Sequence, residues 1–148
     1  MGKEQLENWI QMKLDAIRDD MAAGNLESAK ERLLGIPMHA GPNSRFAEEI
    51  GHLYLQLDYP EMAGRYWYFV EHKTPEMISA CEKFDRSFGD NPFIMYPALG
   101  WKGLFKKDSF GYQKFEELDG RAAEIRKQNE LPWSSRPTLR DRIHLHRL

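Results

Sequence analysis

The sequence predicts an all-α protein assembled from antiparallel pairs of helices. Two observations support this prediction. Through residue 88 the apolar side chains recur every three or four residues, as on one face of a helix, and the alternation typical of strands is almost absent. Related positions also recur at a spacing of 34 residues, which is typical of a helical repeat array. With 148 residues and 41% hydrophobic composition, we expect one domain over 1–148, made of helical repeats over 1–88 and a capping extension with a basic tail over 89–148.

The first helix pair is predicted over residues 6–34. One face of its first helix is apolar, at Leu6, Ile10, Leu14, Ile17 and Met21. Residues 23–25, Ala-Gly-Asn, are expected to end this helix, because glycine readily adopts the left-handed conformation of a helix cap. A second helix over Leu26–Leu34 follows, and so short a turn requires the two helices to be antiparallel.

The second pair is predicted over residues 46–72. The apolar face of its first helix consists of Phe46, Ile50, Leu53 and Leu57. After a turn at 58–60, a helix over 61–72 carries an apolar arc too wide for one partner helix, so we expect Tyr66, Trp67 and Phe69 to lie in the core. On its polar face, Glu61 and Arg65 are spaced to form an ion pair.

The second pair carries a recognisable spacing of small and aromatic residues. It reads Ala47-x-x-Ile50-Gly51-x-x-Tyr54, then Ala63-x-x-x-Trp67, then Pro75. This pattern resembles the tetratricopeptide repeat (TPR), with Ala47 in place of the usual leading Trp. The first pair matches less well, because Ile17 and Asp20 stand where Gly and Tyr are usual. The resemblance covers about residues 10–88 and implies TPR-like helix pairs whose first helices line a groove for a peptide or protein segment.

A second resemblance rests on residues 63–68, AGRYWY. This string is similar to an A-G-R-Y-W-[YF] motif of a family of short, uncharacterised bacterial proteins with repeat-like helices. The resemblance implies no activity and assigns no functional residue.

A third unit is expected to stop after its first helix. Residues 75–88, PEMISACEKFDRSF, supply that helix, with Met77, Cys81, Phe84 and Phe88 on one face. The small residue of a partner helix would fall on Pro97, and proline inside a helix costs about 3 kcal/mol. The array is therefore predicted to have about two and a half units.

The last third combines prolines and glycines with seven aromatic residues between 91 and 115, a composition typical of ordered rather than disordered chain. We expect irregular structure with a short helix that caps the array, with Trp101 buried against the face of the third unit. A helix over 113–128 is predicted to bury Phe115, Leu118, Ala122 and Ile125 and to carry a Glu117–Arg121 ion pair. The basic tail could fold back on the acidic repeats, because the two segments carry opposite net charge.

Composition limits the classes of function. Residues 1–88 carry a net charge of −5 and residues 89–148 a net charge of +3, which is too little for a nucleic-acid interface. The absence of a leader and of a long apolar run predicts a cytoplasmic protein without a membrane span. A short membrane-surface patch remains an alternative, at Trp101, Leu104 and Phe105 beside Lys102, Lys106 and Lys107.

No chemistry-bearing motif stands out. The lone cysteine, Cys81, shares a face with apolar residues, as a structural thiol does. Glu48 and His52 lie one helical turn apart, but without companion ligands a surface ion pair is expected rather than a metal site. We therefore predict no enzyme activity, no cofactor and no metal.

The sequence accordingly predicts a non-catalytic module that binds a protein or peptide, as a monomer or weak homodimer. Its expected contacts flank the buried faces of the first helices or lie on the polar face of 61–72: Arg18, Arg45, Glu48, His52, Leu55, Arg65 and Tyr68. Tyr68 is also compatible with a place on the surface or beneath the C-terminal extension. An immunity or antitoxin-type inhibitor of a bacterial toxin is the alternative function, and an unrecognised enzyme is the second alternative.

Overall fold

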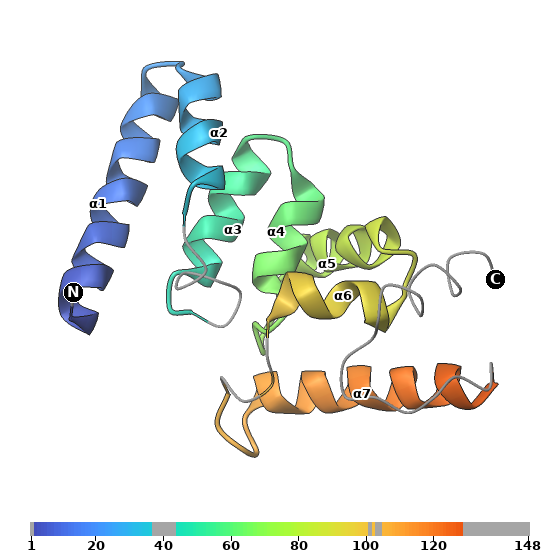
Figure 1. Cartoon of the computed structure of the whole chain (residues 1–148). Helices are drawn as coiled ribbons and strands as arrows, with labels where there is room; N and C mark the ends of the chain where they lie inside the picture. The colour runs from blue at the N-terminus through green and yellow to red at the C-terminus, as the bar shows by residue number, and fades with distance from the viewer. Residues whose placement is uncertain (1, 37–43, 101, 103–104, 129–148) are drawn as a thin grey trace.

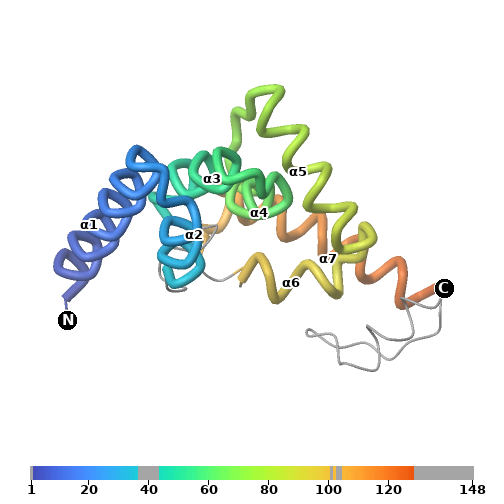
Figure 2. Tube along the Cα trace, turned by 90° about the horizontal axis from the view of Figure 1, so that it is seen from above, coloured from blue at the N-terminus to red at the C-terminus, as the bar shows by residue number. Residues whose placement is uncertain are grey.

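A computed structural model describes residues 2–36, 44–100, 102 and 105–128, and this part of the chain is helical, with no strand. The helices are α1 (Lys3–Ala22), α2 (Leu26–Leu34), α3 (Ala47–Gln56), α4 (Pro60–Trp67), α5 (Pro75–Ser87), α6 (Pro92–Leu99) and α7 (Phe110–Gln128). The helices α1 and α2 form one antiparallel hairpin and α3 and α4 a second beside it, while α7 runs beneath α6 (Figure 1). Seen from above, α5 leads away from the two hairpins toward the end of α7 (Figure 2). The all-α prediction is confirmed.

The turns follow the local sequence. Gly24 adopts a φ of 79° between α1 and α2, the left-handed conformation expected at this position. Pro60 and Pro75 begin α4 and α5. Proline lacks a backbone N–H, and at the start of a helix this costs no hydrogen bond, because an N–H there has no acceptor within the helix. Thr74 caps α5, because its hydroxyl accepts a hydrogen bond from the backbone N–H of Met77 at 3.2 Å.

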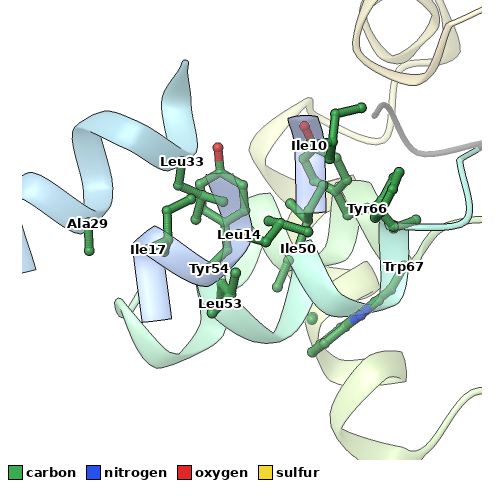
Figure 3. Packing of buried hydrophobic residues seen from close by; sticks show 14 of the residues in the cluster. Ile10, Leu14, Ile17, Ala29, Leu33, Ile50, Leu53, Tyr54, Tyr66 and Trp67 are labelled. Atoms are coloured by element: carbon green, nitrogen blue, oxygen red, sulfur yellow. The ribbon is translucent and has the colours of Figure 1, made fainter. Parts of the chain in front are cut away.

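A first core joins the two hairpins to the start of α5. Its fully buried side chains include Ile10, Leu14 and Ile17 of α1 and Ile50 and Trp67 of the second hairpin (Figure 3). The complete set of buried members is Ile10, Leu14, Ile17, Ala29, Leu33, Phe46, Ala47, Ile50, Leu53, Tyr54, Ala63, Tyr66, Trp67, Met77 and Ala80. The predicted apolar faces of the first four helices therefore meet in one core.

Two glycines allow the closest approaches in this core. A Cβ at Gly51 would overlap the indole ring of Trp67, which lies across α3 at this point. A Cβ at Gly64 would overlap the carbonyl oxygen of Ala80, so that α4 and α5 cross with their backbones in contact. Glycine is required at both positions because even a methyl group would separate the helices.

A second core covers the far side of α5. Its buried members are Tyr68, Phe84, Met95, Leu99, Phe115 and Leu118. The rings of Phe84 and Phe88 have their centroids 4.8 Å apart within it. The last third of the chain thus packs against the Phe84 and Phe88 end of α5, as expected, whereas Trp101 and the basic tail lie outside the described residues.

The helix α6 forms around Pro97, which stands two residues before its end. Asn91 begins this helix by accepting a hydrogen bond from the Phe93 N–H at 2.9 Å. A short helix was expected in this segment, and its buried residues Met95 and Leu99 contribute to the second core rather than to the first.

Two predicted ion pairs, Glu61–Arg65 and Glu117–Arg121, are wrong. In each case the arginine guanidinium donates a hydrogen bond to a backbone carbonyl of a distant segment instead. Arg65 donates to the carbonyl of Ala98, and Arg121 donates to that of Asp90. A charge-assisted hydrogen bond to a fixed carbonyl competes well with an exposed pair between residues four apart.

We predict that Gly64→Ala lowers the free energy of unfolding by about 1–3 kcal/mol, because the new methyl group must push α5 away from α4. Gly120 offers a matched control, since it is helical in α7 and a Cβ there meets nothing within 4 Å. Gly120→Ala should be neutral or stabilising by up to about 1 kcal/mol. Urea unfolding followed by circular dichroism measures both changes, and equal effects of the two substitutions would contradict the close crossing.

We also predict that a chain ending at Asp90 associates or aggregates. The truncation removes α6 and α7 and exposes Tyr68 and Phe84, and burial of one large aromatic side chain contributes about 1.5–3 kcal/mol. Light scattering and thermal melting of residues 1–90 test this. A monomeric fragment that melts like the full chain would show that the last third is an appendage.

Candidate functional site

Four of the predicted contact residues line one hollow on the surface between α1 and α3. They are Arg18, Arg45, Glu48 and His52, and the rest of the lining is Glu49, Leu53 and Gln56. The hollow has a volume of about 490 Å³. We call it the α1/α3 hollow.

Helical periodicity places these side chains together. Arg18 follows the buried Ile17 on α1, so it projects from the flank of the buried face. On α3, Glu48 and His52 are one turn apart and stand beside the buried Ile50. Because both buried faces enter the same core, the flanking polar residues of α1 and α3 meet over it.

The two arginines connect α1 to α3 and to the turn before it through partly exposed ion pairs. Arg18 contacts Asp15 at 3.2 Å and also Glu49, and the Arg45 Nε lies 3.3 Å from a carboxylate oxygen of Glu7. The side chains of Arg18 and Arg45 remain 46% and 58% exposed. Exposed pairs contribute at most about 1 kcal/mol, so these guanidinium groups can exchange their internal partners for groups of a ligand.

Trp67 supports the hollow from behind. Its indole N–H donates a hydrogen bond to the Glu48 carbonyl oxygen at 3.0 Å. The rings of His52 and Trp67 make a T-shaped contact with centroids 4.9 Å apart. The predicted ion pair between Glu48 and His52 is wrong, because none of the ion pairs among the described residues joins them. A buried, fixed ring thus holds one wall of the hollow in place.

A second hollow adjoins the first, because Arg45 and Glu48 line both. Its volume is about 450 Å³, and its other lining residues are Ser44, Ala47, Phe69, Val70, Glu71, His72 and Phe105. The rings of Phe69 and Phe105 lie 4.6 Å apart and give this hollow an aromatic floor. This aromatic floor could not be predicted from the sequence, because the apolar arc of residues 61–72 places Phe69 in the core and Phe105 falls in the capping segment.

The remaining predicted contacts lie elsewhere. Leu55 packs partly buried against the first core and does not line the α1/α3 hollow. Arg65 is occupied by the carbonyl of Ala98. Tyr68 is only 6% exposed, with its ring 5.8 Å from that of Phe84, so its assignment to a partner-binding surface is corrected to the second core. Tyr68 keeps helical backbone torsions at the end of α4, and it is buried because side chains of α5 and α7 cover the face that was expected to be polar.

A third concavity, the α5/α7 cleft, has a volume of about 260 Å³. Its lining residues are Tyr68, Lys73, Ile78, Cys81, Glu82, Asp85, Lys114, Glu117, Leu118 and Arg121. Burial raises the pKa of the Cys81 thiol to about 11, and burial also raises the pKa of the Tyr68 phenol. Both groups stay protonated near neutral pH, so neither supplies a nucleophile to this cleft.

Among the described residues, no three His, Cys, Asp or Glu side chains are grouped as metal ligands would be. Within the same part of the chain, none of the helices combines the length and apolar character needed to cross a bilayer.

A family model matches residues 9–144, nearly the whole chain, and its description is "Family of unknown function (DUF6584)". A search of curated proteins finds no match. A search of solved structures also finds none.

We predict that Cys81 reacts slowly with thiol reagents while the chain is folded. Its raised pKa leaves little thiolate at pH 7.5, and the thiol donates to the Gly64 carbonyl at 3.6 Å, so modification by a disulfide reagent should be at least about tenfold slower than in urea. The rate should rise as the pH approaches 11. Stopped-flow absorbance measures these rates, and equal rates for the folded and unfolded chain would contradict the assignment as a structural thiol.

Proposed function

The chain belongs to the DUF6584 family, and we propose that this member is a non-catalytic protein that binds a protein or peptide segment in the α1/α3 hollow. One observation carries the proposal: Arg18 of α1, Arg45 of the turn before α3, and Glu48 and His52 of α3 converge on one hollow. Their backbones stand on a rigid core, which lowers the entropy lost on binding.

The proposed ligand is a segment of mixed character. Two arginines and two glutamates line the α1/α3 hollow, so its charges balance and suit neither a polyanion nor a polycation. The adjoining hollow offers the aromatic floor of Phe69 and Phe105. A segment with charged residues of both signs and one apolar anchor would fit the two hollows, and their small area implies weak to moderate affinity.

We further propose that α1–α2 and α3–α4 are TPR-like units and that α5 begins a third. The close packing of Trp67 on Gly51 supports this, because it uses two positions of the sequence pattern that resembles the repeat. The proposal places the hollow on the first helices of the units, where such arrays hold their ligands. A cytoplasmic location is part of the same proposal.

The absence of catalysis is also proposed. In the α5/α7 cleft the thiol and the phenol are held protonated, and no described His lines that cleft. In the α1/α3 hollow the ring of His52 packs against that of Trp67, and no Ser, Thr or Cys lines the hollow. A nucleophile with an adjacent base, as covalent catalysis needs, is therefore lacking in both places.

Site-specific crosslinking combined with charge reversal tests the proposal. A photo-crosslinking residue at Gln56, in the hollow, should capture a defined partner in the native host, and the same residue at Lys83, on the exposed side of α5, should not. The combined change Arg45→Glu and Glu48→Arg should weaken binding of that partner at least about tenfold, since it reverses both charges shared by the two hollows.

Arg86→Glu on the exposed side of α5 is the matched control and should leave binding unchanged. Calorimetry with the purified partner gives the affinities, and thermal melting shows that each variant is folded. Equal affinities for the double variant and the wild type would place the binding surface elsewhere.

A further inference from the structure

The α5/α7 cleft has a composition unlike that of the two hollows around Arg45. Besides the Tyr68 phenol and the Cys81 thiol, it contains three carboxylates and three basic side chains, drawn from α5, α7 and the loop between α4 and α5. The bases are already engaged within the chain. Lys73 donates to the Val70 carbonyl, Lys114 lies 3.1 Å from Glu117, and Arg121 donates to the Asp90 carbonyl.

Asp85 is in the opposite situation. Its Oδ1 is buried and accepts no hydrogen bond from any described residue. Buried carboxylate oxygens in folded proteins nearly always accept a hydrogen bond. The cleft therefore contains a carboxylate oxygen that lacks a donor, while each of its bases already has one partner within the chain.

The charges around Asp85 are mixed. Burial is the main cause that raises the pKa of this carboxyl, and the neighbouring Asp90 and Glu82 raise it further. Arg121 and Lys114, both from α7, act in the other direction without outweighing burial. An additional cation beside Asp85 would stabilise its charged form.

Apolar walls flank this acceptor. Leu118 and the ring of Tyr68 are buried at the inner side, and Ile78 lines the cleft with 47% of its surface exposed. A methylene chain lying against Ile78 would cover apolar surface now in contact with water, which is favourable. The cleft thus combines a wall for an aliphatic stem with an acceptor for a charged head.

We propose that the α5/α7 cleft binds an organic cation on an aliphatic stem, of the arginine or lysine type, whose head donates hydrogen bonds to Asp85 and whose stem lies on Ile78. Glu82, exposed one turn before Asp85 on the same helix, provides a second carboxylate at the rim. This site is separate from the α1/α3 hollow, with which it shares no lining residue.

The same cation can come from a free amino acid or from a side chain within a peptide. Lys73 and Lys114 line the cleft together with Asp85, so the carboxylate of a free amino acid would find cations there. An arginine or lysine side chain within a peptide has no free α-carboxylate of its own to place beside these lysines. Comparing free L-arginine with N-acetyl-arginine amide separates the two sources.

The test is an NMR titration of the full-length protein that follows the Asp85 side-chain carboxyl. N-acetyl-arginine amide should shift this signal and lower the pKa of Asp85, whereas the isosteric, uncharged N-acetyl-citrulline amide should bind at least about tenfold more weakly. Asp85→Asn should weaken binding of the arginine amide by a similar factor. Tighter binding of free L-arginine than of its amide would assign the site to free amino acids, and equal or weaker binding to a peptide side chain.

A matched variant and a stability measurement keep the role of Asp85 testable. Arg45→Glu, in the other site, should leave these affinities unchanged. Because the folded pKa of Asp85 is raised, its ionisation opposes folding, so Asp85→Asn should raise the melting temperature at pH 7. That gain should disappear below the unfolded pKa, where Asp85 is protonated in both states.

Equal binding of the arginine and citrulline amides, or unchanged binding by the Asp85→Asn variant, would overturn the proposal. A folded Asp85→Asn variant with a lower melting temperature at pH 7 would also overturn it, because the carboxylate would then have a structural partner. Binding that the Arg45→Glu change abolishes would assign the ligand to the α1/α3 hollow instead.

Discussion

The contact between Trp67 and Gly51 is the constraint on which the arrangement of helices depends. The indole occupies the space that any Cβ at position 51 would need, and its N–H is fixed to the Glu48 carbonyl. This contact sets the depth and direction of α4 against α3. The position of α4 then determines that of α5, which crosses it at Gly64. The indole also supports His52, so the chemistry of the α1/α3 hollow rests on a residue of the core.

The first hairpin and the α1/α3 hollow could be predicted because they follow from local periodicity. The helix predicted over Leu26–Leu34 has the same bounds in the structure. The apolar spacing of α1 and α3 identifies which faces are buried, and Arg18, Glu48 and His52 project beside those faces. Because the buried faces of α1 and α3 pack in the same core, residues that flank these faces lie near each other. Their convergence could therefore be predicted from local periodicity alone.

The end of α4 could not be predicted, because its cause lies far along the chain. Nothing in residues 68–72 forbids a helix, yet α4 ends at Trp67, and Tyr68 and Phe69 pack with Phe84 and Phe115. The contact with Phe115 exists only once α7 has folded back. The same holds for Arg65 and Arg121, whose guanidinium groups find carbonyl oxygens about thirty residues away rather than carboxylates one turn away. Exact helix ends and surface ion pairs are weak local preferences that tertiary contacts readily override.

The adjacent residues Trp67 and Tyr68 belong to different cores. Trp67 supports the α1/α3 hollow, and the ring of Tyr68 forms a wall of the α5/α7 cleft, so one peptide bond separates the supports of the two proposed sites. A ligand that displaced either ring would act on backbone directly bonded to the residue that carries the other. Any coupling free energy transmitted in this way is reciprocal, because each ligand must alter the affinity of the other by the same factor.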